Sequence, residues 1–405
     1  MKDMRKITFS PPDITEAEIQ LVAETMRSGW ITTGPKVQEL ERKIAAFVHT
    51  PKAVCMSSAT SCMEMILRTL GVGEGDEVIT SAYTYTASAS CAAHVGAKVV
   101  FVDTQKDCVE MDYDQLANAI TERTKVIIPV DLGGIVCDYD RVFSIVESKR
   151  SLFRPANDLQ KAYGRIIVMA DGAHAFGASR HGKMCGEIAD FTAFSFHAVK
   201  NFTTAEGGAA TWRSHEGVDD EALYKNLQLF TLHGQNKSAL AKTRLGNWEY
   251  DIIAPYYKCN MTDIMAAIGL AQFERYPSLL ERRKAIIERY NAGLHNCHVA
   301  VLPHFGEDHR SSGHLYIVRL LGLDVAERNQ VITEMAERGI ACNVHYKPLP
   351  MMTAYKAMGY DIKDFPNAYN LYRNAMTLPL HTLLSDEDVD YVLDNLVDIL
   401  HKFDA

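Results

Sequence analysis

The sequence predicts an α/β protein in which a large domain with a mostly parallel sheet precedes a smaller α+β domain. Between Lys52 and Trp212, short apolar runs alternate with amphipathic helical patterns. Strands whose residues are all apolar and that are separated by helices are typical of parallel sheets covered by helices on both faces. From about residue 275 the pattern changes to long helices with interspersed strands. We therefore expect two domains, residues 1–274 and 275–405.

Composition and charge exclude several classes of protein. Of the 405 residues, 47% are hydrophobic and 23% are charged, as in ordinary soluble enzymes. The net charge of -9 argues against nucleic acid as a partner, because phosphate binding requires a basic face. No apolar stretch approaches the ~20 residues of a membrane helix, so no membrane partner is expected. Nine scattered cysteines without a C-x-x-C pair predict no disulfide framework and no metal site, and they favour a reducing cytoplasm.

Two amphipathic helices are expected at the N-terminus. Thr15 and Glu18 form a capping-box pattern at the start of the first helix, and Gly29 ends it. The apolar face of this helix carries Ile19, Val22 and Met26. The second helix is predicted from the periodic stretch KVQELERKIAAFVHT, residues 36–50.

The alternating region then contributes the sheet and its covering helices. Strands are expected at 52–56, 76–82, 97–103, 124–131, 165–171, 191–196 and 207–212, and helices at 61–71, 113–120 and 141–150. The polar stretch 148–164 is expected as a surface excursion with some helix. In the C-terminal part, long helices are expected over 260–294, a further helix at 328–339, and strands at 314–320 and 340–346.

Polar side chains follow several of the predicted strands, and ligands of such sheets bind at the carboxyl ends of strands. One of them is Lys200, which follows the apolar run of residues 191–196. A lysine whose pKa is depressed attacks carbonyl groups and forms a Schiff base, as pyridoxal phosphate requires. Asp171 ends another strand and offers the carboxylate that keeps the pyridine nitrogen of this cofactor protonated. His174 is within reach of the ring hydroxyl.

The remaining needs of that cofactor are a phosphate site and an aromatic face. Ala59 and Thr60 follow two serines at a predicted helix start, where backbone N–H groups meet anions. Ser195 adds a hydroxyl, and Tyr85 is expected to stack on the ring. Taken singly, each of these residues has an ordinary structural explanation, such as a helix cap or a packed core aromatic. Their occurrence together at successive strand ends favours a pyridoxal phosphate site.

Several motifs resemble the DegT/DnrJ/EryC1/StrS family of nucleotide-sugar aminotransferases. They are SGWITTGPKVQELE, SSATSCMEM, ADGAHAFGA, FSFHAVKNFTTAEGGAA and YKCNMTDIMAAIGLAQ. The resemblance extends from about residue 8 to the C-terminus. It implies the type I fold of aspartate aminotransferase, a homodimer with shared active sites, L-glutamate as amino donor, and a nucleotide-linked keto-sugar aminated at C4 as acceptor.

The same resemblance assigns roles to individual residues. It makes Lys200 the lysine of the internal aldimine and the proton carrier, with Asp171 at the pyridine nitrogen. It further implies that Asn260 reaches the phosphate from the partner subunit and that His345 faces the sugar. The other cofactor-binding residues are those proposed above from the strand ends, namely Ala59, Thr60, Tyr85, His174 and Ser195.

The sequence is less consistent with three alternative functions. A pyridoxamine-dependent sugar dehydratase of the same family has histidine in place of the lysine, so Lys200 disfavours it. A regulatory protein that binds the cofactor without turnover is disfavoured by the complete set of site residues. A Schiff-base lyase or decarboxylase of free amino acids is expected to need an arginine for the α-carboxylate, and no arginine lies in the motifs in that role.

Overall fold

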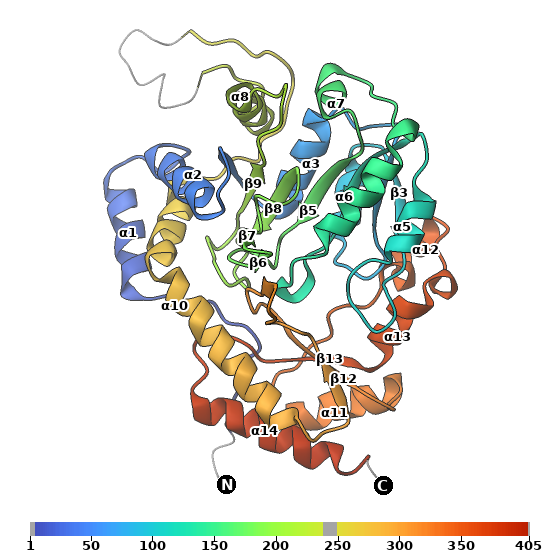
Figure 1. Cartoon of the computed structure of the whole chain (residues 1–405). Helices are drawn as coiled ribbons and strands as arrows, with labels where there is room; N and C mark the ends of the chain where they lie inside the picture. The colour runs from blue at the N-terminus through green and yellow to red at the C-terminus, as the bar shows by residue number, and fades with distance from the viewer. Residues whose placement is uncertain (1–4, 238–248, 404–405) are drawn as a thin grey trace.

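The computed structural model describes residues 5–237 and 249–403 and contains a central seven-stranded sheet (Figure 1). The strand order is β1-β9-β8-β5-β4-β2-β3, and only β9 runs against the others. The strands are β1 (Ala53–Met56), β2 (Glu77–Ser81), β3 (Lys98–Val102), β4 (Thr124–Ile128), β5 (Ile167–Asp171), β8 (Phe191–Ser195) and β9 (Gly208–Trp212). The mostly parallel sheet predicted from the sequence is therefore confirmed.

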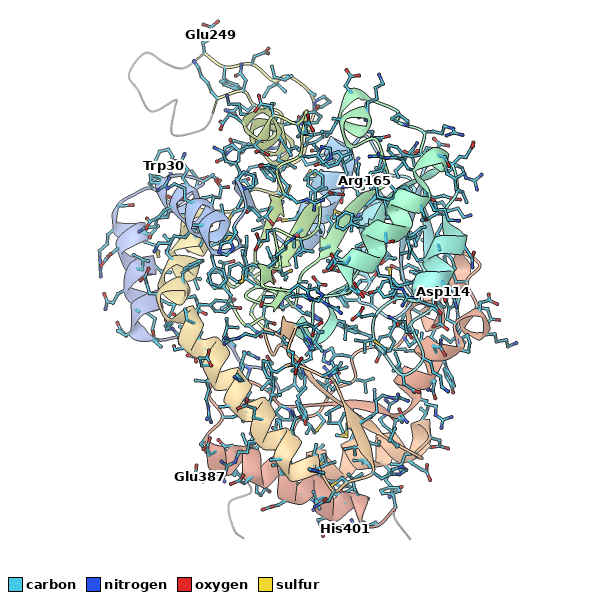
Figure 2. All side chains as sticks on the ribbon, viewed as in Figure 1. Trp30, Asp114, Arg165, Glu249, Glu387 and His401 are labelled. Carbon is cyan, nitrogen blue, oxygen red and sulfur yellow. The ribbon has the colours of Figure 1, made fainter. Side chains whose placement is uncertain are left out.

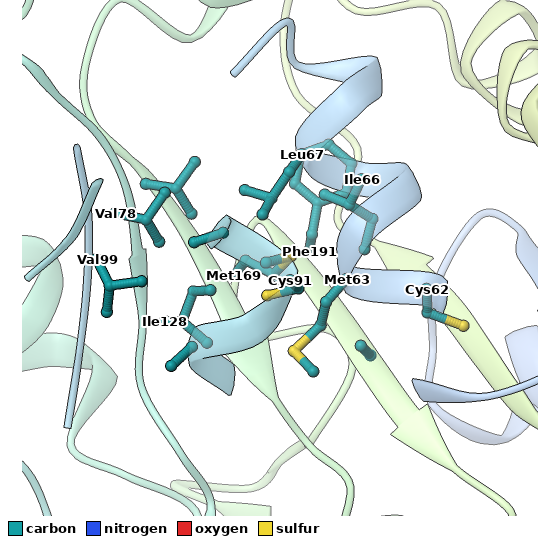
Figure 3. Packing of buried hydrophobic residues seen from close by; sticks show 14 of the residues in the cluster. Cys62, Met63, Ile66, Leu67, Val78, Cys91, Val99, Ile128, Met169 and Phe191 are labelled. Atoms are coloured by element: carbon teal, nitrogen blue, oxygen red, sulfur yellow. The ribbon is translucent and has the colours of Figure 1, made fainter. Parts of the chain in front are cut away.

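Helices cover both faces of this sheet. One face packs on α3 (Ala59–Thr69), α4 (Ala87–His94) and α8 (Asp220–Thr231); the other packs on α2 (Pro35–Phe47), α5 (Tyr113–Ala119), α6 (Tyr139–Ser148) and the first part of α10 (Asp263–Leu294). Successive strand residues enter opposite layers: Val126 and Ile128 join the α3 side and Ile127 joins the α6 side. Figure 3 shows the α3 layer, where Met63 and Ile66 pack toward the strands.

Helix α1 (Glu16–Arg27) forms with the predicted capping box of Thr15 and Glu18. It packs along α10. Its predicted apolar face is not buried within this chain, because Ile19 and Met26 are 54% and 59% exposed. The chain therefore presents an apolar helix face to its surroundings.

The excursion at 148–164 contains the short helices η2 (Arg150–Leu152) and α7 (Asp158–Tyr163), as expected. The side-chain amides of Asn157 and Gln160 both donate to the carbonyl of Leu70. These bonds attach the excursion to the end of α3.

The C-terminal part forms a second core around the antiparallel sheet β10 (Val299–Val301), β12 (Tyr316–Leu320) and β13 (Ala375–Leu378). Helices α11 (Val325–Glu337) and α14 (Asp386–Leu400) and the later part of α10 surround this sheet. Glu387 and His401 mark the two ends of α14 in Figure 2. The remaining elements are β6 (Ser179–Arg180), β7 (Lys183–Met184), β11 (His309–Arg310), η1 (Leu132–Gly134), η3 (Leu349–Met351), α12 (Thr353–Ala357), η4 (Ile362–Asp364) and α13 (Pro366–Asn374).

One predicted strand differs from the structure. The stretch 340–346 makes only isolated bridges, from Ile340 to Ile7 and from Asn343 to Thr377. Because these two partners belong to different segments, the stretch does not align along one strand. It instead connects the two cores, because Ile340 belongs to the C-terminal core and Tyr346 packs against the core of the large sheet.

The division at residues 274 and 275 falls inside α10 and stays a proposal. Tyr276 and Leu279 of this helix still belong to the core of the large sheet, whereas Ile286 and Tyr290 belong to the C-terminal core. Over the described residues, no helix combines the length and apolar character that crossing a membrane requires.

Candidate active site

A cavity of about 390 Å³ opens at the carboxyl ends of the parallel strands. Its walls come from the start of α3, the loop after β2, the end of β5, the loop between β8 and β9, and the segment around residue 345. Eight of the nine predicted site residues line it: Ala59, Thr60, Tyr85, Asp171, His174, Ser195, Lys200 and His345. The structure thus brings together residues that are up to 286 positions apart, from 59 to 345. Their individual roles remain predictions.

Lys200 lies in the loop that follows β8. Its backbone N–H donates to the carbonyl of His197 at 2.8 Å, and the hydroxyl of Thr203 donates to the carbonyl of Phe196 at 3.1 Å. These bonds hold the loop that presents the lysine. Burial lowers the pKa of Lys200 to about 8, although the nearby charge of Asp171 acts in the opposite direction. An amine with this pKa is a far better nucleophile at neutral pH than an ordinary lysine.

Asp171 is a buried carboxylate at the end of β5. The hydroxyl of Ser88, on α4, donates to its Oδ2 at 2.5 Å, and the N–H of Ala173 donates to its Oδ1 at 3.2 Å. Burial raises the pKa of Asp171, while these hydrogen bonds and the charge of Lys200 oppose the rise. A buried carboxylate in this setting favours a cationic group in the cavity. Sequence reasoning missed Ser88, because no local pattern links α4 to the end of β5.

His174 is buried and lines the same cavity. Its Nδ1 accepts a hydrogen bond from the N–H of Gly133 at 3.2 Å, and its Nε2 is 3.2 Å from the hydroxyl of Tyr346. Burial, followed by the charge of Lys200, lowers the pKa of His174 well below its ordinary value. Tyr346 was also missed, although it directly follows His345 in the sequence.

The opposite end of the cavity is formed by the N-terminus of α3. Ser58 caps this helix by accepting the N–H of Ser61, which leaves the N–H groups of Ala59 and Thr60 at the positive helix end. Ser195 pairs with Gly208 in the adjoining strands. A Cβ atom on Gly208 would lie 2.5 Å from the backbone nitrogen of Ala59, so glycine is required where β9 approaches α3. The arrangement suits an anion.

Two aromatic residues and a histidine line the outer part of the cavity. Tyr85 is 60% exposed, so it is not a packed core residue. Its ring lies 6.0 Å from that of Tyr346. His345 stacks on Phe9 at 5.6 Å, and its Nδ1 is 2.9 Å from the hydroxyl of Thr377. Burial lowers the pKa of His345 to about 4, so the ring is neutral near pH 7.

His197 also lines the cavity. Its Nε2 lies 3.5 Å from a carboxylate oxygen of Glu206. Both residues lie in the loop between β8 and β9 that carries Lys200, residues 196–207, which we call the lysine loop.

Asn260 is the predicted site residue that is not among the described residues lining the cavity. Its amide nitrogen donates to the hydroxyl of Thr33 at 2.5 Å, and its amide oxygen accepts from Lys258. The segment nevertheless runs beside the end of β1, where the N–H of Ser57 donates to the carbonyl of Cys259 at 2.8 Å.

Comparison with known proteins identifies the family. The model of the DegT/DnrJ/EryC1/StrS aminotransferase family matches residues 12–397. The chain belongs to this family. It is 37% identical over 402 residues to the spore coat polysaccharide biosynthesis protein SpsC of Bacillus subtilis, with 98% of each chain covered. It is 58% identical to the putative sugar aminotransferase Spr1654 of Streptococcus pneumoniae in its PMP form, with a TM-score of 0.96 and coverage of 98% of this chain and 100% of that one.

Family membership confirms two predictions. The first is the type I fold, and the second is the cofactor, because the DegT/DnrJ/EryC1/StrS aminotransferases depend on pyridoxal phosphate. The donor set of this chain fits that group: a lysine of lowered pKa, a buried carboxylate and a helix N-terminus line one cavity.

Proposed function

We propose that this protein is a sugar aminotransferase that moves the amino group of L-glutamate to the C4 keto group of a nucleotide-linked keto-sugar. The observation that carries the proposal is Lys200, a lysine with a pKa of about 8 that shares one cavity with the buried carboxylate of Asp171. The likeness to a sugar aminotransferase and to a polysaccharide biosynthesis protein supports a sugar as the acceptor.

When bound, pyridoxal phosphate supplies an electrophilic carbonyl and a ring that withdraws electrons from the substrate carbon. Lys200 would hold that carbonyl through its amine. As a free amine it would be the base that accepts a proton from the donor α-carbon and the acid that donates one to the sugar carbon. Asp171 keeps the pyridine nitrogen protonated by ion pairing, and Ser88 holds one carboxylate oxygen in place. In the net reaction L-glutamate loses its amino group and becomes 2-oxoglutarate, and the sugar gains that amino group in place of its keto oxygen.

The proposed phosphate site combines backbone and hydroxyl donors. The N–H groups of Ala59 and Thr60 lie at the N-terminus of an 11-residue helix, whose dipole favours an anion. Ser195 adds a hydroxyl from β8. Tyr85 is the aromatic residue for the ring face, and His174 serves the ring hydroxyl.

The outer cavity is the proposed sugar site. His345 is neutral and offers hydrogen-bonding nitrogen rather than positive charge, which suits the hydroxyl groups of a sugar. Exposed aromatic rings such as Tyr85 also pack on sugar rings through their apolar faces. None of the described residues lining the cavity belongs to the excursion at 148–164, so we assign that segment no contact with substrate.

We also propose that two copies form a homodimer with shared active sites in the cytoplasm. An apolar groove beside the lysine loop supports the dimer: it is lined by Pro12, Ile14, Ile19, Val22, Ala23, Met26, Ala198, Ala205 and Ile268, among others. Asn260, outside the cavity of its own chain, is proposed to reach the phosphate in the partner. Nine free cysteines support a reducing compartment.

The test uses the protein converted to its pyridoxamine form with excess L-glutamate and then freed of small molecules. This form is mixed with UDP-, dTDP- and GDP-linked keto-sugars, each with the keto group at C4 or at C3. We expect one C4-keto compound to restore the visible absorbance of the pyridoxal form and to yield an amino sugar by mass spectrometry. Lys200→Ala, loaded with pyridoxamine phosphate, is the control and should give no product, because it lacks the proton carrier.

Two results would contradict the proposal. One is substantial turnover by Lys200→Ala, and the other is product formation only from free keto acids.

A further inference from the structure

Tyr346 lines the cavity wall beside His174. Its hydroxyl oxygen lies 3.2 Å from Nε2 of His174, and the two rings stack with centroids 6.2 Å apart and an interplanar angle of 20°. On another side its ring contacts that of Tyr85. The same cavity holds Lys200 and Asp171. The phenol therefore belongs to the space in which the cofactor is expected.

The backbone at Gly133 determines which nitrogen of His174 carries the proton. The N–H of Gly133 points at Nδ1 and donates to it, so Nδ1 is unprotonated. The imidazole is neutral, because burial and the charge of Lys200 lower the pKa of His174 well below its ordinary value. A neutral imidazole whose Nδ1 is unprotonated carries its proton on Nε2, and Nε2 is the atom that lies near the hydroxyl of Tyr346.

This assignment fixes the direction of the next hydrogen bond. His174 donates from Nε2 to the phenol oxygen of Tyr346, and a hydroxyl that accepts in this way keeps its own proton for another acceptor. Burial and the charge of Asp171 raise the pKa of Tyr346, so the phenol stays protonated. Among the described residues, none supplies an acceptor for that proton. The phenol is a partly buried donor, and the hydrogen bond from His174 leaves its proton free for another acceptor.

We propose that Tyr346 donates this proton to the ring hydroxyl oxygen of the bound pyridoxal group, so that His174 acts on that oxygen through Tyr346. The inference depends on the cofactor of the proposed function and does not depend on the identity of the sugar or the amino donor. In the cofactor, the ring oxygen shares a proton with the nitrogen that joins it to Lys200. A hydrogen bond donated to the ring oxygen lowers the affinity of that oxygen for the shared proton. Loss of the donor should therefore raise the pKa at which the shared proton dissociates.

The test is a pH titration of the visible absorbance of the holoenzyme. Tyr346→Phe keeps the ring and its contacts but removes the phenol proton, and we expect the titration midpoint to rise by about one pH unit, the effect of one hydrogen bond to a charged group. Tyr355→Phe is the matched control, since it removes a phenol that bonds to Thr86 outside the residues lining the cavity and should leave the midpoint unchanged. Thermal unfolding of each variant reports on the fold.

A second measurement keeps the proposal testable if Tyr346→Phe loses the absorbing form. Binding of pyridoxal phosphate to the apoprotein is compared with binding of an analogue that lacks the ring hydroxyl. Tyr346→Phe should weaken the first about tenfold and the second not at all. An equal effect on both would overturn the proposal, as would an unchanged midpoint together with a raised KM for the sugar, which would assign the phenol to substrate. Failure of the wild-type protein to absorb visibly with pyridoxal phosphate would refute the proposed function instead.

Discussion

The reactivity of the site depends on the environment of one amine. An ordinary lysine has a pKa near ~10.4, whereas burial lowers the pKa of Lys200 to about 8. At pH 7 the fraction of free amine is therefore on the order of 100-fold larger than in a surface lysine. The carboxylate of Asp171 limits this shift, because its negative charge favours the ammonium form. The two residues are thus coupled before any ligand binds.

This coupling predicts the pH dependence of cofactor capture by the apoprotein. Only the free amine attacks the carbonyl, so the rate of covalent capture should rise with pH and be half-maximal near pH 8. Stopped-flow absorbance at fixed pyridoxal phosphate measures this rate. Asp171→Asn removes the charge that stabilises the ammonium form and should move the midpoint to lower pH. A midpoint near that of surface lysines in the wild-type protein would contradict the structure.

At the scale of the elements, the features that depend on neighbouring residues could be predicted from the sequence, and those that depend on contacts between distant segments could not. The strands were predictable because each is a short apolar run, and α1 was predictable from the pattern of Thr15 and Glu18. The stretch 340–346 was not, because its partners lie in two distant segments. The same reason explains the site: Asp171 ends a recognisable strand, but its partner Ser88 comes from α4, 83 positions earlier.

The contact between α4 and β5 gives an element-scale prediction. Ser88→Ala removes the donor to Oδ2 of Asp171 and leaves that buried oxygen unpaired, so the carboxylate should be held less well against the pyridine nitrogen. We expect the affinity for pyridoxal phosphate to fall about tenfold, measured by equilibrium dialysis. Ser90→Ala, two positions along the same helix, controls for the change in helix composition. Unchanged affinity in Ser88→Ala would show that Ala173 alone holds the carboxylate.

At the scale of the whole molecule, two features are unexplained by a single chain. The apolar stripe of α1 is exposed, with Ile19 and Met26 more than half accessible, and the groove beside it includes Ala198 and Ala205 of the lysine loop. Asn260 lies outside the cavity of its own chain. A symmetric dimer through the α1 face would bury the stripe next to the active site and bring a second chain to it. The exposure of the stripe could not be predicted from the sequence, because periodicity does not say what covers a helix, whereas a role of Asn260 in the partner subunit was implied by the family resemblance.

Shared active sites can be tested by mixing two inactive variants. Lys200→Ala lacks the nucleophile, and Asn260→Asp places a negative charge against the phosphate, so each homodimer should be inactive. In a mixed dimer with shared sites, one site collects both substitutions and the other collects neither. Equal mixing after dissociation and reassembly should then restore about a quarter of wild-type activity, because half of the dimers are mixed and each has one intact site. Size-exclusion chromatography with light scattering verifies reassembly. If Asn260 instead served its own chain, every site would carry one substitution, and the mixture would stay inactive although the dimers had formed.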